Sequence, residues 1–330
     1  MLERNQSVRE PLGATLITGL RKVAFGLFSI LLVVLLAGAS YQFFSNRRDL
    51  RLHPPPGQMI DIGGYRLHLD CTGHGLPTVV FDSGLSDDSI TWYKVQPEIA
   101  KVTRSCSYDR AGLGWSDPSP LPRTSRVVAE ELHRLLKNAK IEGPFILVGH
   151  SLGGLNIRMF AALYPGDTAG VVLVDSAYPD QYKRLPVEVQ SYNAKFLRRL
   201  GYFEDTMLFG WPRLSGWCDQ WPAAIRAVRR ATECRLQPWL THLAEYRAFD
   251  ESSAQILATK SLGDIPLVVL SHDTSEPGPM ATAWSQMQKD LTSLSSRSSY
   301  VVVPGSTHVI QADHPQAVID AIHEEIAELR

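Results

Sequence analysis

Residues 145–154 read Phe-Ile-Leu-Val-Gly-His-Ser-Leu-Gly-Gly, an apolar run that ends in the pattern G-x-S-x-G. The run has the length of a buried strand, and residues 155–164 have the composition of a helix that follows directly. A serine on a sharp strand-to-helix turn has strained backbone geometry, so the residues two positions away must be small, as Gly149 and Gly153 are. We therefore expect an exposed Ser151 hydroxyl at a helix start, where backbone N–H groups stabilise negative charge.

The overall composition is that of an ordinary globular protein. The chain has a net charge of −1 and 44% hydrophobic residues. Its 330 residues are enough for one large domain or two smaller ones. This charge balance gives no reason to expect a nucleic-acid partner. The cysteines form no C-x-x-C pair, so a zinc site is not expected. Their even number is compatible with disulfides in an oxidising compartment.

An apolar segment near the N-terminus predicts a membrane anchor. Residues 23–44 carry no charge, and a helix of about 20 residues crosses a bilayer core. The flanking positions carry positive charges and interfacial aromatic side chains: Arg21, Lys22, Arg47, Arg48, Tyr41, Phe43 and Phe44. We expect a tail over 1–22, an uncleaved transmembrane signal anchor over 23–44 and a linker over 45–57. The alternative is a signal peptide cleaved at the small residues 37–39.

Strand-like and helical segments alternate through the rest of the chain. The expected strands are 58–63 and 65–71, which form a hairpin, then 78–82, 103–108, 145–150, 171–174, 267–270 and 300–303. Residues 124–138 and 315–329 have helical spacing. Such alternation predicts a mostly parallel sheet with helices on both faces, whose functional residues gather at the carboxyl ends of the strands. Those positions hold Leu85, Ser151, Asp175, Asp273 and His308.

Residues 59–330 resemble an α/β-hydrolase-fold enzyme. The resemblance rests on GHSLGG at 149–154, DRAGLGWSD at 109–117 and a late G-x-x-H that ends at His308. It implies an eight-stranded, mostly parallel sheet in a domain over 58–330, with a helical cap inserted at about 177–262. It does not fix a substrate. The DRAGLGWSD segment is mainly a structural turn in this family, and we assign it no catalytic role.

The family resemblance implies a Ser–acid–His triad in that chain order. Ser151 would be the nucleophile, and His308 would take its proton. Three other histidines compete less well: His150 should point away from the hydroxyl, His314 begins a helix, and His272 is a weak rival.

The acid of the triad stays open between two aspartates. The position most often used in the family falls closest to Ser275, which is not an acid. Some members place the acid directly after the sixth strand, which favours Asp175. Asp273, near the usual position but out of register, is the alternative.

The oxyanion hole would consist of two backbone N–H groups, those of Leu152 and Leu85. Gly84 lets the backbone approach the substrate, although this chain has Ser-Gly where the family often has His-Gly. A haloalkane dehalogenase is disfavoured, because those relatives have aspartate rather than serine at the turn.

The cap insertion is rich in aromatic residues that line a pocket or pack the cap against the core: Trp211, Trp217, Trp221, Trp239, Phe196, Tyr202, Phe203 and Phe209. Its expected helices are 187–200, 222–234 and 238–257. In the family fold, the strands that hold Cys71 and Cys106 are neighbours, so the resemblance implies a disulfide there. A second disulfide, Cys218–Cys234, would lie within the cap, and four free thiols are the alternative.

We therefore expect a membrane-anchored, extracytoplasmic serine hydrolase that cleaves small to medium carboxylic esters through an acyl-enzyme, without a metal or organic cofactor. An amidase, thioesterase or lactonase on the same triad is one alternative. A non-catalytic binding protein on a hydrolase scaffold is the other. Flanking charges that nearly balance leave the membrane orientation open.

Overall fold

A computed structural model describes the whole chain except residues 1–11, 190–205, 260, 277 and 330. Its strands are β1 (Gln58–Asp61), β2 (Arg66–Thr72), β3 (Thr78–Asp82), β4 (Ser105–Tyr108), β5 (Phe145–His150), β6 (Thr168–Val174), β7 (Leu267–His272) and β8 (Ser298–Val303). They form one sheet in the order β1-β2-β4-β3-β5-β6-β7-β8. Strand β2 is antiparallel to both of its neighbours, β1 and β4, and the other neighbouring strands are parallel to each other. The predicted mostly parallel, eight-stranded sheet is confirmed.

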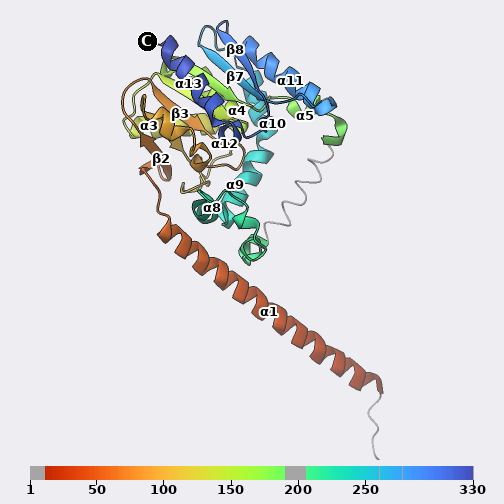
Figure 1. The fold of residues 1–330 in the computed structure, drawn as a ribbon. Helices are drawn as coiled ribbons and strands as arrows, with labels where there is room; N and C mark the ends of the chain where they lie inside the picture. The colour runs from red at the N-terminus through yellow and green to blue at the C-terminus, as the bar shows by residue number, and fades with distance from the viewer. Residues whose placement is uncertain (1–11, 190–205, 260, 277, 330) are drawn as a thin grey trace, which may run out of the picture.

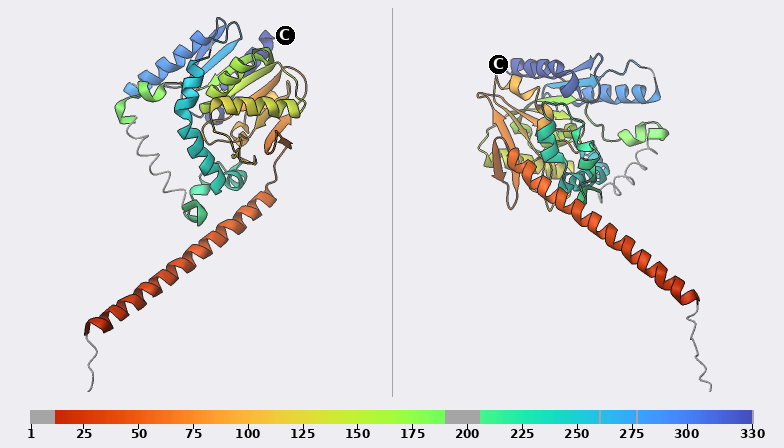
Figure 2. Two further views of the ribbon diagram at one scale, coloured as in Figure 1. Left: turned by 180° about the vertical axis from the view of Figure 1, so that it is seen from behind. Right: turned by 60° about the horizontal axis from the view of Figure 1, so that its bottom comes forward.

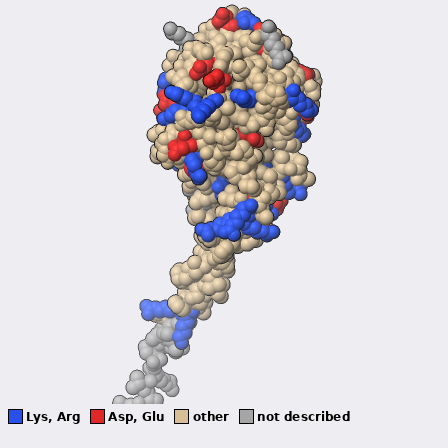
Figure 3. All heavy atoms as spheres, turned by 90° about the vertical axis from the view of Figure 1, so that its left-hand side faces the viewer, with Lys and Arg blue, Asp and Glu red and all other residues tan. Residues whose placement is uncertain are grey.

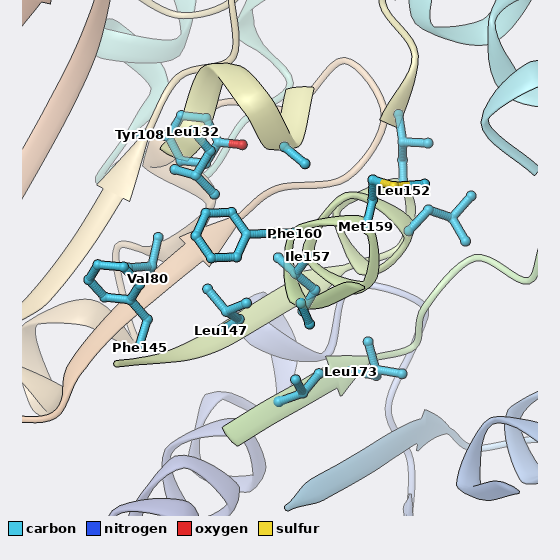
Figure 4. Packing of buried hydrophobic residues seen from close by; sticks show 14 of the residues in the cluster. Val80, Tyr108, Leu132, Phe145, Leu147, Leu152, Ile157, Met159, Phe160 and Leu173 are labelled. Atoms are coloured by element: carbon cyan, nitrogen blue, oxygen red, sulfur yellow. The ribbon is translucent and has the colours of Figure 1, made fainter. Parts of the chain in front are cut away.

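The helices that pack around the sheet are α2 (Gln96–Ile99), α3 (Ser125–Asn138), α4 (Leu152–Leu163), α10 (Phe249–Leu257), α11 (Pro279–Leu291), α12 (Ile310–Asp313) and α13 (Pro315–Glu328). Successive side chains of a strand point to opposite faces. Phe145 and Leu147 of β5 therefore pack with α3 and α4, as Figure 4 shows. Ile146 and Val148 pack on the other face with α2 and α13. Helices thus cover both faces, as predicted.

The insertion between β6 and β7 contains α5 (Gln181–Arg184), α7 (Trp211–Leu214), α8 (Arg226–Glu233) and α9 (Leu236–Arg247). The helix expected over 238–257 is in fact two, α9 and α10, which meet at Ala248. Phe249 and Ile256 bury α10 against α3 and α4, so α10 belongs to the layer that covers the sheet rather than to the cap. Most of the helix expected over 187–200 lies outside the described residues, as do Phe196, Tyr202 and Phe203.

Helix α1 (Leu12–Leu52) extends away from the globular part of the chain (Figures 1 and 2). Within the described residues it is the one helix long and apolar enough to cross a membrane, over Gly19–Leu52, where a stretch of 18 residues has a mean hydropathy of 2.5. Residues 45–52, expected as linker, are helical instead. The first proline after the span is Pro54, and Asn46 and Asp49 bond to the cap, which keeps this part of the chain helical.

Both expected cysteine pairs are disulfide-bonded in the structure. Cys71 and Cys106 lie directly opposite each other on β2 and β4. Cys218 and Cys234 join the two ends of the segment that contains α8. These two pairs account for all four cysteines of the sequence.

Candidate active site

Ser151 lies between β5 and α4 with a backbone φ of +49°, a conformation that non-glycine residues rarely adopt. The surrounding backbone is too close for side chains on the neighbouring glycines. A Cβ on Gly149 would lie 2.6 Å from the carbonyl oxygen of Gly153, and one on Gly153 would lie 2.4 Å from that of Asp82. The G-x-S-x-G pattern is therefore a steric requirement of this turn.

His308 lies between Ser151 and Asp175. Its Nε2 is 3.1 Å from Ser151 Oγ, and its Nδ1 is 2.5 Å from Asp175 Oδ2. His308 stands in the loop between β8 and α12, while Asp175 directly follows β6. Of the two candidate acids, Asp175 is the one that contacts the imidazole.

Asp175 is fully buried and accepts four hydrogen bonds. Its Oδ1 accepts from the Trp284 indole N–H at 2.9 Å and from the His272 backbone N–H at 3.0 Å. Its Oδ2 accepts from His272 Nδ1 at 2.7 Å and from His308. Burial alone would raise the pKa of the Asp175 carboxyl, but the hydrogen bonds and charges of His272 and His308 outweigh it and hold that pKa well below its usual value. Asp175 is therefore a carboxylate at neutral pH.

Asp273 has a different environment. It accepts the Gly305 N–H at 2.7 Å and the Ser275 N–H at 2.8 Å, and among the described contacts it has none with His308. These two bonds lower the pKa of Asp273. Asp273 thus joins the β7 loop to the loop that carries His308, without touching the imidazole.

The other histidines support the site or lie outside it. His150 is buried, and its Nε2 donates to the His308 carbonyl oxygen at 2.8 Å, so it holds the His308 loop. Burial and the nearby His308 lower the pKa of His150 to about 4, which keeps its ring neutral. His314 precedes α13 and bonds to Asp313 at 3.1 Å.

The loop after β3 lies against the nucleophile. A Cβ on Gly84 would be 2.8 Å from His150 Nδ1 and 3.4 Å from Ser151 Cβ. Leu85 follows in this loop, and Leu152 is the first residue of α4. Within the described part of the chain, neither the Leu85 nor the Leu152 backbone N–H donates a hydrogen bond. Both N–H groups are thus free to bind an oxygen atom.

A buried arginine that the sequence reasoning left without a role holds this loop in place. Arg110, from the DRAGLGWSD segment, donates to the carbonyl oxygens of Ser83 at 2.7 Å and Gly84 at 2.6 Å. It also pairs with Asp82 at 2.8 Å and with Glu245 at 2.6 Å. Burial alone would lower the pKa of Arg110, but the charges of Glu245 and Asp82 raise it above its usual value. Arg110 is therefore always charged.

Glu245 brings the cap into the same network. It lies on α9, and its Oε2 accepts the Ser86 backbone N–H at 3.1 Å. The sequence reasoning missed this residue, because Glu245 and Arg110 are 135 positions apart. The loop that holds Leu85 is thus fixed on both sides of this residue. Arg110 binds the carbonyl groups of Ser83 and Gly84, and Glu245 of the cap binds the N–H of Ser86.

Two groups of described residues have the composition of a metal site. In the first, His272 and His308 both hydrogen-bond to Asp175, as described above. In the second, the Arg229 guanidinium contacts three carboxylates: Asp87 at 2.6 Å, Asp88 at 3.0 Å and Glu233. Hydrogen bonds and ion pairs within the chain account for both groups.

The fold and the serine turn define a protein of the α/β-hydrolase class. The chain belongs to the Alpha/beta hydrolase family, whose sequence model matches residues 74–321. It is similar to the uncharacterized protein YqjL of Bacillus subtilis (strain 168), at 26% identity over 250 residues, 75% of this chain and 82% of YqjL. Several other curated relatives are longer, and the chain spans only 20% of their length.

Solved enzyme structures share the fold. A thermophilic esterase from Thermogutta terrifontis superposes with a TM-score of 0.60 at 22% identity, over 82% of this chain and 98% of the esterase. The haloalkane dehalogenase DbeA from Bradyrhizobium elkani USDA94 superposes with a TM-score of 0.68 at 16% identity, over 82% of this chain and 97% of DbeA. At these identities the likeness concerns the fold and leaves the reaction open.

Proposed function

We propose that the protein is a serine hydrolase that cleaves a carboxylic ester through an acyl-enzyme. The observation that carries this proposal is the hydrogen-bonded series Asp175–His308–Ser151. A neutral hydroxyl is a poor nucleophile, and His308 Nε2, 3.1 Å from Ser151 Oγ, is within reach of its proton. The buried Asp175 carboxylate orients the imidazole and stabilises the imidazolium that forms.

The reaction takes place in two halves. Ser151 Oγ attacks the ester carbonyl carbon while His308 accepts the proton, and the N–H groups of Leu85 and Leu152 bind the developing oxyanion. His308 then gives the proton to the leaving alcohol as the C–O bond breaks. Water, deprotonated by His308, attacks the carbonyl carbon of the acyl-Ser151 ester. The bond between this carbon and Ser151 Oγ then breaks, His308 returns the proton to Oγ, and the carboxylic acid is released. No metal or organic cofactor takes part.

Hydrolysis of matched substrates tests this proposal. The purified full chain is assayed with p-nitrophenyl butyrate, the corresponding anilide and the corresponding thioester, alongside Ser151→Ala. We expect the ester to be cleaved fastest, and Ser151→Ala to be inactive. Preference for the anilide or the thioester would favour an amidase or thioesterase on the same triad. A folded wild type that cleaves none of them would favour a binding protein.

We also propose that α1 anchors the chain in a membrane, with the catalytic domain on the extracytoplasmic side. The helix is long and apolar enough to span a bilayer, and two disulfides suit an oxidising compartment. The mass of the mature protein tests the anchor. An intact N-terminus and resistance to carbonate extraction are expected, whereas loss of residues 1–39 would identify a cleaved signal peptide.

A further inference from the structure

The carboxyl-terminal part of α1 is bonded firmly to the cap. The Arg213 side chain is buried and donates to Gln42 Oε1 at 3.1 Å, to Asn46 Oδ1 at 2.8 Å and to the Asp49 carboxylate. Gln42 Nε2 and Arg213 also donate to the Cys234 carbonyl oxygen, at 2.8 and 3.2 Å. Three consecutive turns of α1 therefore fix the position of the segment that contains α7.

Two close approaches show how far along α1 this cap segment lies. A Cβ on Gly38 would lie 2.6 Å from the Phe209 carbonyl oxygen, and one on Gly210 would lie 2.9 Å from the Tyr41 ring. Gly38 precedes Arg47 by about 14 Å, at about 1.5 Å of rise per residue. A hydrocarbon core of about 20 residues that starts after Lys22 ends near Gln42. Gly210, beside Tyr41, thus lies at the depth where the core of the bilayer meets the headgroups, and Phe209, beside Gly38, lies about 6 Å deeper.

Large apolar side chains are exposed on this same segment. Leu208, Trp211 and Leu214 are 45%, 58% and 63% exposed. Single exposed apolar residues are normal, but here three fall within seven positions beside the apolar helix. Exposed tryptophan beside a membrane span is typical of the membrane–water interface.

The neighbouring surface of α1 has the chemistry of the same interface. Its exposed aromatic and basic side chains follow one another toward the domain: Tyr41, Phe43, Phe44, Arg47, Arg48 and Arg51. Figure 3 shows basic side chains gathered where α1 meets the globular part, above a stretch of helix that bears no charge. A cationic surface at the end of α1 that meets the globular part suits binding to anionic lipid headgroups.

We propose that residues 207–214, the interfacial segment, insert into the headgroup region of the bilayer that α1 enters. This inference rests on the proposed anchoring by α1. The occupant of the exposed apolar surface is lipid, because the segment is bonded to the span at the depth of the headgroups and is continuous with its aromatic and basic side chains. The cap is then held at the membrane surface by two attachments, the helix and the interfacial segment.

Quenching of Trp211 fluorescence by brominated phosphatidylcholine tests the proposal. The full chain is reconstituted in vesicles whose lipids carry bromine near the headgroup or deep in the acyl chain. The emission of Trp211→Phe is subtracted from that of the wild type, which removes the six other tryptophans. We expect the Trp211 emission to fall at least twofold with shallow bromines and less with deep ones. An emission equal in brominated and plain vesicles would overturn the proposal.

A matched pair of charge substitutions sharpens the test. Leu214→Glu places a charge on the interfacial segment, and Leu257→Glu places one at the end of α10, where Leu257 is similarly exposed at 62%. We expect Leu214→Glu to reduce the quenching of Trp211 and Leu257→Glu to leave it unchanged. If Leu214→Glu and Leu257→Glu changed the quenching of Trp211 equally, the result would count against insertion. Trp211 emission that changed with protein concentration but not with bromine would also count against it.

The measurement separates this inference from the proposed function. It needs no catalytic turnover, so an inactive protein whose Trp211 is quenched would contradict only the hydrolase proposal. A chain that resists carbonate extraction but shows no quenching would contradict only the insertion of residues 207–214. A chain that carbonate extracts would overturn both the anchor and the insertion.

Discussion

His272 Nδ1 lies 2.7 Å from Asp175 Oδ2, the carboxylate oxygen that His308 also contacts. The His272 backbone N–H bonds to the other oxygen of the same carboxylate at 3.0 Å. One residue therefore holds both oxygens of Asp175 in place for His308. The hydrogen bond to Asp175 raises the pKa of His272 above its ordinary value of 6.5.

This contact predicts a pH-dependent stability. The folded protein favours protonated His272, so the stabilisation that His272 gains from Asp175 depends on pH. This stabilisation is fully present below about pH 6.5 and is lost as the pH rises through the raised pKa of His272. We expect His272→Gln to lower the free energy of unfolding by about 1 kcal/mol at pH 5.5, the net value of one hydrogen bond, and by less at pH 9. Urea unfolding at the two pH values measures this, and equal losses at both would contradict the account.

The two candidate acids differ in their contacts, so replacing each by asparagine should change kcat to a different extent. Asp175→Asn removes the charge that stabilises the His308 imidazolium, so we expect kcat to fall by about 10⁴-fold, as for other serine triads. Asp273→Asn alters only two loop hydrogen bonds. We expect it to change kcat by less than about tenfold, equal to 1.4 kcal/mol. The opposite order of effects would make Asp273 the acid.

The Arg110–Glu245 pair should affect turnover as well as stability. Glu245→Gln leaves the buried Arg110 with only one of its two carboxylate partners, Asp82. This loss costs on the order of 3 kcal/mol of stability. It also loosens the loop that holds Leu85, so we expect kcat to fall about 10- to 100-fold, short of the loss of a whole oxyanion-hole donor.

The matched control is Glu131→Gln. Arg123 and Glu131 form a bidentate pair at 2.9 Å that is also buried, and among the described contacts it touches no residue of the Leu85 loop. We expect this variant to lose stability and keep its kcat. If the two variants lost kcat equally, the effect would come from general destabilisation rather than from the loop.

Gly84 should not tolerate a side chain. A methyl group there would lie 2.8 Å from the buried His150 ring, and His150 holds the loop of His308. We expect Gly84→Ala to reduce kcat by about 10²-fold, the scale of a disturbed oxyanion hole. Gly166→Ala serves as the control, because nothing lies within 4 Å of its Cβ position. Steady-state kinetics of both variants that gave equal kcat values would contradict the predicted contact.

Much of the fold was predictable because its signals are local. Buried strands such as β5 are apolar runs of fixed length, and the glycines around Ser151 mark its turn directly. Helix α11 also has a local signal that the sequence reasoning did not use. Its Pro279 suits a helix start, and Trp284, Met287 and Leu291 fall on one buried face.

The remaining features depend on contacts between distant parts of the chain. Asp175 and Asp273 both follow strands, and only the folded loops decide which carboxylate reaches His308. The pairing of Arg110 with Glu245 leaves no pattern in the sequence around either residue. The part of α1 beyond residue 44 bonds through Asn46 and Asp49 to Arg213, which lies far along the chain.

The most direct test of the central claim is the site of covalent labelling by a fluorophosphonate probe. The full chain is labelled and digested, and the modified peptide is identified by mass spectrometry in the wild type and in Ser151→Ala, His308→Ala, Asp175→Asn and Asp273→Asn. We predict one adduct, on Ser151, which is lost in Ser151→Ala, is strongly slowed in His308→Ala and Asp175→Asn, and persists in Asp273→Asn. A folded wild type that does not label, or that labels elsewhere, would contradict the account.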